Sequence, residues 1–178
     1  MTSTFRSIDM QKHWTEKELK EKLRKMNVIV DSREQKQHVK DYLDKKGVGI
    51  IERKLDVGDY SAQIDDMTFE HSIAIERKNS IDELCGNMTS QRDRFEREFL
   101  RAKALGCKVF LIIENASWND VLCHNYSSLM DSKSLFASLC AWQARFNVTI
   151  VFADKANMAS ILYGILYYFC RKELLGDY

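Results

Sequence analysis

The polar end of one apolar stretch, Ser72-Ile73-Ala74-Ile75-Glu76-Arg77-Lys78, decides how this 178-residue chain is expected to fold. Its pattern predicts a β-strand, in which neighbouring side chains point to opposite faces of a sheet. The two isoleucines and Arg77 share one face, which we expect to meet the core. Glu76 and Lys78 therefore leave the strand together on the other face, about 6–7 Å apart along the chain.

A second acid comes from the segment that precedes this strand. Val57-Gly58-Asp59-Tyr60 has the composition of a turn, and a short strand is expected to follow it over 61–64. If this hairpin folds back on the strand over 70–78, Asp59 lies beside Glu76. The pattern then brings two carboxylates and one lysine to the same edge of a sheet.

Such a group of side chains suits metal-assisted cleavage of a phosphodiester bond. Magnesium prefers hard oxygen ligands and keeps several of its waters. The ion can polarise a phosphoryl oxygen and lower the pKa of a bound water. A nearby lysine can orient that water or stabilise the charge that grows on phosphorus.

A plainer interpretation stays open at this point, because an acid followed by an E-x-K pattern arises by chance in many charged proteins. Asp59 would then be an ordinary turn residue. Glu76 and Lys78 would form the solvated edge of a strand.

The rest of the sequence indicates an α/β fold. Lys108-Val-Phe-Leu-Ile-Ile-Glu114 is almost wholly apolar, as in a central strand buried on both faces. The strands over 48–54, 61–64 and 70–78 read as a meander, and the whole as a mixed β-sheet flanked by helices. We expect further strands at 27–31 and 148–152, and helices at 14–26, 37–46, from 80, 89–105, 117–123, 133–146 and 156–174.

Composition narrows the class of protein. The length suits one domain, and a hydrophobic share of 45% with a charged share of 30% suits a soluble core-forming chain. No apolar run approaches the ~18–20 residues of a membrane span, and no signal peptide follows Met1, so we expect a cytoplasmic protein. The five cysteines are scattered and the histidines lack ligand spacing, which argues against disulfides and a zinc site.

Three sequence elements in order resemble a known family. Gly58-Asp59, Glu76-Arg77-Lys78 and Asp82 are similar to the G-D…E-R-K-x-x-x-D signature of XPF-type (ERCC4-domain) structure-specific endonucleases, which act in DNA repair and recombination. Val30-Asp31-Ser32-Arg33-Glu34 resembles the upstream V-D-x-R-E element of that family. Leu111-Ile112-Ile113-Glu114 resembles the strand that follows its long helix.

This resemblance covers roughly residues 27–152 and carries implications for the fold. It implies a restriction-endonuclease-like mixed β-sheet flanked by helices. We expect residues 1–26 to form an N-terminal arm and helix, with the arm at 1–13, and residues 27–178 to form the nuclease domain.

The resemblance also implies the roles of individual residues. Asp59 and Glu76 would ligate Mg²⁺ or Mn²⁺, with the carbonyl of Arg77 as a candidate third ligand, and Lys78 would be the catalytic lysine. Four more residues would complete or support the catalytic site, namely Asp31, Arg33, Glu34 and Asp82.

Each supporting residue also has an ordinary explanation. Asp82 stands in the first turn of a helix, where the helix dipole favours any acid. Asp31 could simply end a strand. Arg33 and Glu34 could be surface charges.

Arg33, Arg77 and Arg92 are the expected DNA contacts. Strand alternation sends Arg77 away from Glu76, which leaves it as a structural or a phosphate-facing group. Arg92 shares a helical stripe with Phe95, Phe99 and Ala102, so we expect it to face the active site; a snorkelling arginine is the alternative. Arg94, Arg97, Arg101 and Lys103 read as a solvated face, with direct DNA contact as the alternative.

The implied partner is DNA, in branched forms or at junctions of single and double strands, and the implied assembly is a homodimer. Repair members of the family usually carry a helix-hairpin-helix module, for which this sequence has no signal. We therefore expect DNA affinity to be weak or to depend on dimerisation or on a partner, as in a small bacterial or phage nuclease. The alternatives are a catalytically silent DNA-binding or scaffolding subunit and a junction-processing enzyme of the wider restriction-like fold.

Overall fold

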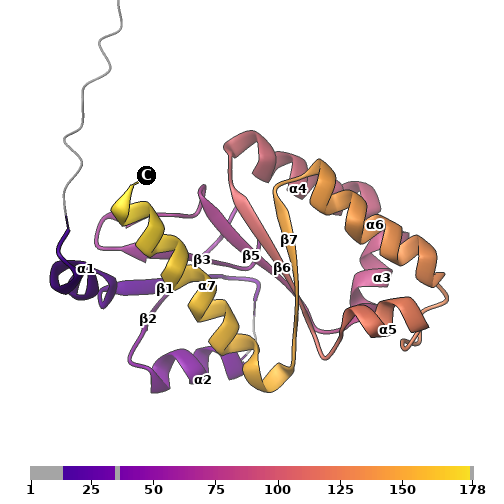
Figure 1. Cartoon of the computed structure of the whole chain (residues 1–178), viewed down its shortest axis with the longest axis horizontal. Helices are drawn as coiled ribbons and strands as arrows, with labels where there is room; N and C mark the ends of the chain where they lie inside the picture. The colour runs from indigo at the N-terminus through magenta and orange to yellow at the C-terminus, as the bar shows by residue number, and fades with distance from the viewer. Residues whose placement is uncertain (1–13, 35–36, 177–178) are drawn as a thin grey trace, which may run out of the picture.

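The computed structural model describes residues 14–34 and 37–176, so the arm expected at 1–13 lies outside the described residues. A mixed sheet runs through the centre of the molecule in the order β2-β1-β3-β5-β6-β7, with a short β4 paired to β3 (Figure 1). The strands are β1 (Met26–Asp31), β2 (Gly49–Arg53), β3 (Tyr60–Ile64), β4 (Met67–Thr68), β5 (Ile73–Lys78), β6 (Lys108–Glu114) and β7 (Val148–Ala153).

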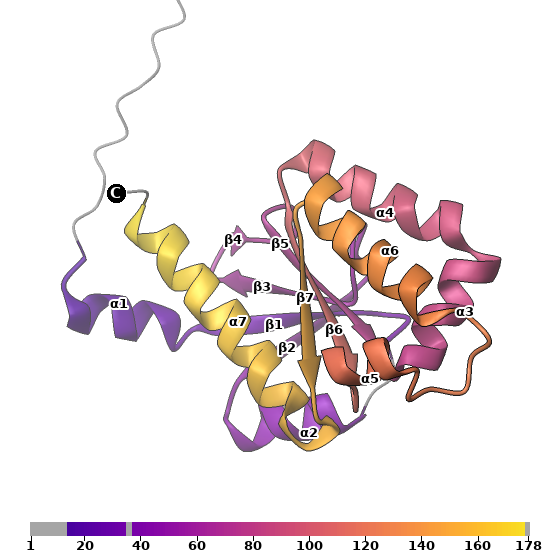
Figure 2. The same cartoon turned by 45° about the vertical axis from the view of Figure 1, so that its right-hand side comes forward.

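Helices cover both faces of this sheet (Figures 1 and 2). One face packs against α1 (Glu16–Leu23), α2 (Gln37–Lys45) and α7 (Lys155–Leu175). The other face packs against α3 (Ile81–Ser90), α4 (Arg92–Leu105), α5 (Trp118–Cys123) and α6 (Ser132–Arg145). The predicted α/β class with helices flanking a mixed sheet is confirmed.

The side chains of β5 alternate between these two layers as predicted. Ile73 and Ile75 belong to the apolar cluster under α1, α2 and α7, whereas Ala74 belongs to the cluster under α3, α4 and α6. β6 lies between two parallel neighbours, β5 and β7, and most of its residues are buried. Its near-continuous apolar sequence is explained by this central position.

The predicted meander is wrong in one of its strands. β2 pairs in parallel with β1 and not with β3, because α2 carries the chain across the sheet between β1 and β2. β1 and β3 are antiparallel neighbours instead. The hairpin that matters for the site does fold back, since Tyr60 of β3 stands opposite Ile75 of β5.

One local detail also differs from the expectation. β5 begins at Ile73, and residues 70–72 form a turn after β4. The helix expected from residue 80 does begin there: the side chain of Ser80 accepts a hydrogen bond from the amide of Glu83, and the carboxylate of Glu83 accepts one from the amide of Asn79 at 2.8 Å.

The described residues include no helix that is both long enough and apolar enough to cross a membrane. All five cysteines are free thiols, and Cys85, Cys107 and Cys170 are buried.

Candidate active site

Asp59 is fixed in place by its own backbone and by the glycine before it. Gly58 has a φ of +70°, and a Cβ at this position would meet the carbonyl oxygen of Ile75 at 2.9 Å. Glycine therefore fits this position for two reasons, the positive φ of the turn and the close approach of the backbone to β5. The amide of Asp59 then donates to the Ile75 carbonyl at 2.8 Å, and its carbonyl accepts from the amide of Asp31 at 2.7 Å.

The side chain of Asp59 reaches across to the polar end of β5. Its Oδ2 accepts a hydrogen bond of 2.8 Å from the backbone amide of Arg77. Glu76 and Asp59 line the same pocket. The hairpin thus brings the two acids together, as the sequence predicted.

Glu76 and Lys78 lie side by side on the α4 face of β5. Lys78 Nζ is 2.7 Å from Glu76 Oε1, and both residues are buried. The ammonium group also lies 4.9 Å from the ring centre of Phe95 on α4 and 4.0 Å from Glu83 Oε1. Lys78 is therefore held between one close carboxylate, one distant carboxylate and an aromatic face.

The pKa values of these groups reflect burial and crowding of like charge. Burial raises the pKa of Asp59 well above its ordinary value, and the charge of Glu76 raises it further. Burial also raises the pKa of Glu76, against the opposing effect of Lys78. For Lys78, burial lowers the pKa, but the charge and hydrogen bond of Glu76 outweigh it and leave the pKa raised. Lys78 is thus a cation at neutral pH.

This arrangement has the chemistry of a cation site that needs few protein ligands. Among the described residues no group of three or more His, Cys, Asp or Glu side chains is placed to hold a metal ion. Both carboxylates have pKa values raised by burial, and that of Asp59 is raised further by the charge of Glu76. They still fit a divalent cation, because the ion would offset the cost of ionising them. Magnesium commonly takes one or two carboxylates and completes its shell with water and phosphate oxygens.

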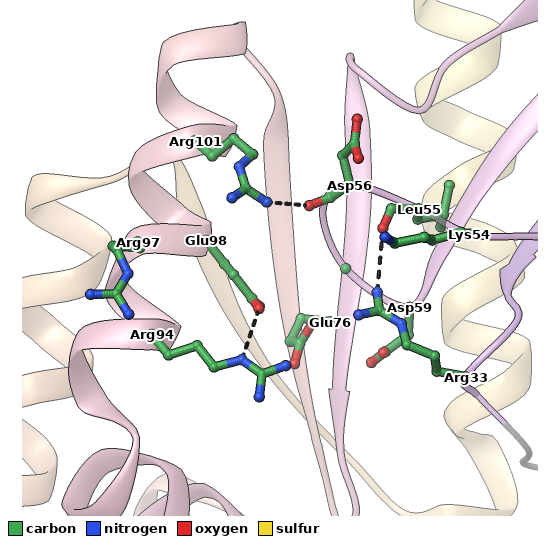
Figure 3. Close-up of a pocket in the computed structure, with 11 residues that line it drawn as sticks. Arg33, Lys54, Leu55, Asp56, Asp59, Glu76, Arg94, Arg97, Glu98 and Arg101 are labelled. Carbon is green, nitrogen blue, oxygen red and sulfur yellow. Dashed lines mark hydrogen bonds and ion pairs between the residues drawn. The ribbon is translucent and has the colours of Figure 1, made fainter.

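The two acids form the floor of a pocket of about 480 Å³ (Figure 3). Arg94, Arg97, Glu98 and Arg101 project from α4 on one side of Glu76. Arg33 and the β2–β3 connection lie on the other side, with Asp59. Basic side chains thus surround an acidic floor.

Asp31 and Arg33 build one wall of this pocket. The guanidinium of Arg33 donates to both carboxylate oxygens of Asp31, at 2.7 and 2.9 Å, and Asp31 Oδ2 also accepts from the amide of Leu55 at 2.7 Å. Burial would raise the pKa of Asp31, but the hydrogen bonds from Arg33 and Leu55 leave it lowered. Asp31 therefore orients Arg33, which lines the pocket edge and remains exposed there.

Glu34 stands close to the site without lining the pocket. Its amide donates to the carbonyl of Asp31 at 2.9 Å. Its charge contributes to the raised pKa of Asp59 and of Tyr60, after the larger effect of burial in both cases. The supporting role of Glu34 stays a prediction.

Arg77 occupies the opposite face of β5 and is closed off from solvent. Its Nε lies 2.6 Å from Glu114 Oε1, and the two side chains are only 2% and 0% exposed. The same carboxylate oxygen is 3.3 Å from His38 Nε2 on α2. Because Arg77 is buried in this pair, we interpret it as a structural residue. The burial argues against its expected contact with DNA.

Two other predicted residues lie away from the pocket. Asp82 is exposed, and its Oδ1 accepts hydrogen bonds from the amides of Ser127 and Ser128, so it anchors the loop between α5 and α6. Arg92 does not face the two acids as expected. Its side chain is 47% exposed and pairs with Glu96, one turn further along α4, at 3.1 Å.

Three arginines predicted to belong to a solvated face, Arg94, Arg97 and Arg101, line the pocket together with Glu98, whereas Lys103 of the same predicted face does not. Arg94, Arg97, Glu98 and Arg101 follow the spacing i, i+3, i+4 and i+7, which places them on one side of a helix. This spacing was available in the sequence as a signal. Glu114, by contrast, was identified only as the end of the family-like strand, and His38 was given no role, so the sequence did not predict that both meet at Arg77.

Comparison with known proteins agrees with this geometry. The chain matches the ERCC4 domain over residues 30–165, which is more than half of its length. XPF from Aeropyrum pernix matches with a TM-score of 0.60 and 23% identity, over 80% of this chain and 66% of that chain. A structure of XPF from Aeropyrum pernix in complex with DNA matches with a TM-score of 0.61 and 24% identity, over 85% of this chain and 68% of that chain.

The chain therefore spans about two thirds of the length of these solved relatives, with which it shares its fold. No curated protein matches it.

Proposed function

We propose that this chain, which belongs to the ERCC4 domain family, is a divalent-metal-dependent DNA endonuclease that hydrolyses phosphodiester bonds. One observation carries the proposal: Asp59 and Glu76 share the floor of one pocket, with the cationic Lys78 2.7 Å from Glu76. Carboxylates whose pKa values are raised in this way are poorly suited to a purely structural role. They are well suited to hold a metal ion beside a phosphate.

Asp59 and Glu76 would hold Mg²⁺ or Mn²⁺, with the carbonyl of Arg77 as a further ligand. The bound ion would supply a polarised phosphoryl oxygen and a more acidic water. Asp59 is positioned for this by two backbone hydrogen bonds and by the bond from the amide of Arg77 to its Oδ2. Oδ2 accepts that bond, so we propose Oδ1 as the ligand atom.

Lys78 would stabilise the negative charge that develops on the phosphoryl group. Its raised pKa keeps it protonated, so it donates hydrogen bonds and is not the base that removes a proton from water. Its bond to Glu76 fixes the ammonium group next to the ligand set. Arg33, oriented by Asp31, would add a second cation at the pocket edge.

DNA is the proposed substrate. Basic residues surround the acidic pocket floor, as a phosphate-bearing ligand requires. The Aeropyrum pernix relative was crystallised in complex with DNA. The preference for branched or flap-like DNA, of the kind handled in repair and recombination, follows from the family resemblance of Gly58-Asp59 and Glu76-Arg77-Lys78.

A homodimer is the proposed assembly. Trp118 and Phe136 of α5 and α6 pack edge to face near the edge strand β7, and both remain partly exposed. Leu122 on α5 and Leu129 in the loop between α5 and α6 are more exposed still, Leu129 completely. An apolar surface of this kind suits contact with a second copy. A dimer by light scattering that becomes monomeric when Leu122 and Leu129 are changed to Glu would support this, whereas a wild-type monomer at high concentration would refute it.

The enzyme proposal is tested by incubating the protein with flap, fork, Holliday-junction, single-stranded and plain duplex DNA in Mg²⁺ or Mn²⁺. We expect metal-dependent cleavage of the branched substrates by the wild type and its loss in Asp59→Asn and Lys78→Ala. Asp56→Asn is the matched control, because Asp56 is an exposed acid of the same pocket and its backbone carbonyl, not its carboxylate, accepts the hydrogen bond from Arg101. We expect this control to cleave like the wild type.

Two results would overturn parts of this proposal. No metal-dependent cleavage of any substrate by the wild type would favour the silent DNA-binding subunit. Cleavage that survives in both Asp59→Asn and Lys78→Ala would remove these residues from the site.

A further inference from the structure

We propose that α4 forms the binding wall for the nucleic-acid backbone, with Arg94 and Arg97 contacting phosphates of the strand that crosses the two acids. This inference rests on the proposed function, whose substrate it describes. It differs from the sequence expectation, which gave the inward position on this helix to Arg92.

Three hollows that share lining residues lie around α4, and we call them together the α4 groove. The pocket over Asp59 and Glu76 shares Arg94 and Glu98 with a second hollow that reaches Lys78 and Gln91. It shares Arg94 and Arg97 with a third hollow at the junction of α3 and α4. Arg94 lines all three hollows. A strand that follows the groove therefore passes Arg94 on its way across the acids.

Arg94 and Arg97 have donors available for a ligand. Arg94 is 64% exposed, and its nearest partner, Glu98, is 3.9 Å away, which is beyond hydrogen-bond distance. Arg97 is exposed and makes no side-chain hydrogen bond or ion pair within residues 14–34 and 37–176 that the structure records. Arg101, by contrast, donates to the carbonyl of Asp56 at 3.1 Å and so ties α4 to the opposite wall (Figure 3).

The charge of the groove favours an anion along this wall. Five basic and four acidic side chains line the pocket over Asp59 and Glu76, so its net charge is positive before any metal binds. The basic groups form the rim, and buried Glu76 with half-buried Asp59 forms the floor (Figure 3). This separation suits a polyanion that crosses the rim while one phosphate descends to the floor.

The same lining points to contact with the backbone of the nucleic acid and not with its bases. Phe95 is the single aromatic residue among the described residues that line the three hollows, and it is 5% exposed. Sequence-tolerant binding through bases usually needs aromatic faces on which bases stack. Arginine contacts to phosphates fix position but carry no sequence information. The groove should therefore bind without regard to sequence and with a steep salt dependence.

The test measures binding of fluorescently labelled single-stranded and duplex DNA by anisotropy, in EDTA, over about 50–200 mM salt. Arg94→Gln and Arg97→Gln should each weaken binding roughly tenfold. Each should also reduce the slope of log K against log salt by about 0.7–0.9, the value of one phosphate contact. Thermal unfolding of each variant checks that it is folded.

Two further variants separate a phosphate contact from a structural effect. Lys103→Gln removes the same charge from the same helix, but Lys103 lies outside the α4 groove and bonds to the carbonyl of Arg145. It should leave affinity and slope unchanged. Arg94→Lys keeps the charge but loses the forked donor, so it should keep the slope and lose part of the affinity.

The inference is overturned if the wild type binds neither DNA, if both glutamine variants keep the wild-type slope, or if Lys103→Gln lowers the slope equally. Cleavage is measured separately in Mg²⁺. Cleavage with unchanged slopes in Arg94→Gln and Arg97→Gln would contradict this inference and leave the proposed function standing. Reduced slopes without cleavage by the wild type would do the reverse.

Discussion

The two faces of β5 at its polar end treat charge in opposite ways. On the α4 face, Glu76 and Lys78 open onto a pocket in which Asp59 adds a second carboxylate, and both acids have raised pKa values. On the α2 and α7 face, Arg77 is buried against Glu114 at 2.6 Å. Glu76 and Lys78 thus lie on a face where carboxylates are costly to ionise, which we call the strained face. Arg77 lies on a face where its charge is paired, which we call the compensated face.

This difference teaches how one short strand can serve two purposes. A buried ion pair contributes little net stability compared with apolar residues, but breaking it leaves an uncompensated charge in the core. The Arg77–Glu114 pair therefore holds the end of β5 against β6. The opposite face keeps carboxylates whose charging is unfavourable until a cation arrives. Stability and the proposed chemistry can then be separated by mutation.

The largest expected effect is on the compensated face. Glu114→Gln should lower the free energy of unfolding by about 3–5 kcal/mol, because it leaves Arg77 buried without a counter-charge. Urea denaturation measures this loss. The double variant Arg77→Met with Glu114→Leu should recover most of it. Exposed ion pairs contribute less than about 1 kcal/mol. A loss of that size in Glu114→Gln would show that the Arg77–Glu114 pair does not hold a buried charge as described.

The next effect belongs to the strained face. Lys78→Ala should lower the rate of metal-dependent cleavage by about 10²–10³-fold, because it removes a cation aimed at the developing charge. Single-turnover cleavage with saturating enzyme measures the rate. A rate within about threefold of wild type, far short of the loss expected for such a donor, would exclude Lys78 from the reaction.

The pH dependence of stability should show the strain directly. Burial and Glu76 raise the pKa of Asp59 above its ordinary value of 3.8, so the folded state keeps a proton that the unfolded state releases. Stability from this group is therefore present at low pH and is lost as pH rises above 3.8 through the raised value. In EDTA, wild type should lose stability relative to Asp59→Asn across that rise.

Urea denaturation of both proteins from pH 4 to pH 8 measures this difference. The range starts near the ordinary pKa of a carboxyl group and extends above it. A divalent cation favours the charged carboxylate, so Mn²⁺ should reduce the difference. A difference that shrinks with rising pH in EDTA would contradict the assigned strain.

The smallest effect is expected at Asp82, which belongs to neither face. Asp82→Asn keeps an oxygen for the amides of Ser127 and Ser128, so stability should fall by about 0.5–1 kcal/mol or less. Cleavage should remain within about twofold of wild type, as for a surface change away from the site. Cleavage assays at one DNA concentration suffice. A tenfold loss of rate would return Asp82 to the site that the signature implied.

Much of the strained face could be predicted from the sequence because its causes are local. Alternation along β5 separates Glu76 and Lys78 from Arg77, and the glycine before Asp59 marks the turn that folds the hairpin back. The apolar sequence of β6 likewise predicts a central strand. These features depend on neighbouring residues and on strand geometry alone.

The compensated face could not be predicted because it depends on pairing between strands. Arg77 reaches Glu114 only because the register of β5 and β6 sets Arg77 opposite Ile112. No local pattern of the sequence fixes that register. The order of β2 and β1 was missed for the same reason, since it depends on where α2 returns the chain.

Helical spacing along α4 predicts some of its side-chain positions but not all of them. The stripe of Phe95, Phe99 and Ala102 is buried as its spacing predicts. Arg92 has the matching phase but stands at the first residue of the helix, where it remains exposed and pairs with Glu96. Helical spacing thus predicts the buried side chains well in the middle of α4 and fails at its end.

The most direct test of the central claim is a Mn²⁺ titration of thermal unfolding for wild type and Asp59→Asn. If Asp59 and Glu76 hold the ion, Mn²⁺ should stabilise wild type by about 2.7 kcal/mol at a hundred times its dissociation constant. Asp59→Asn should be at least as stable as wild type without metal and should gain much less from Mn²⁺. Equal stabilisation of the two proteins by Mn²⁺, or none of wild type, would contradict the account.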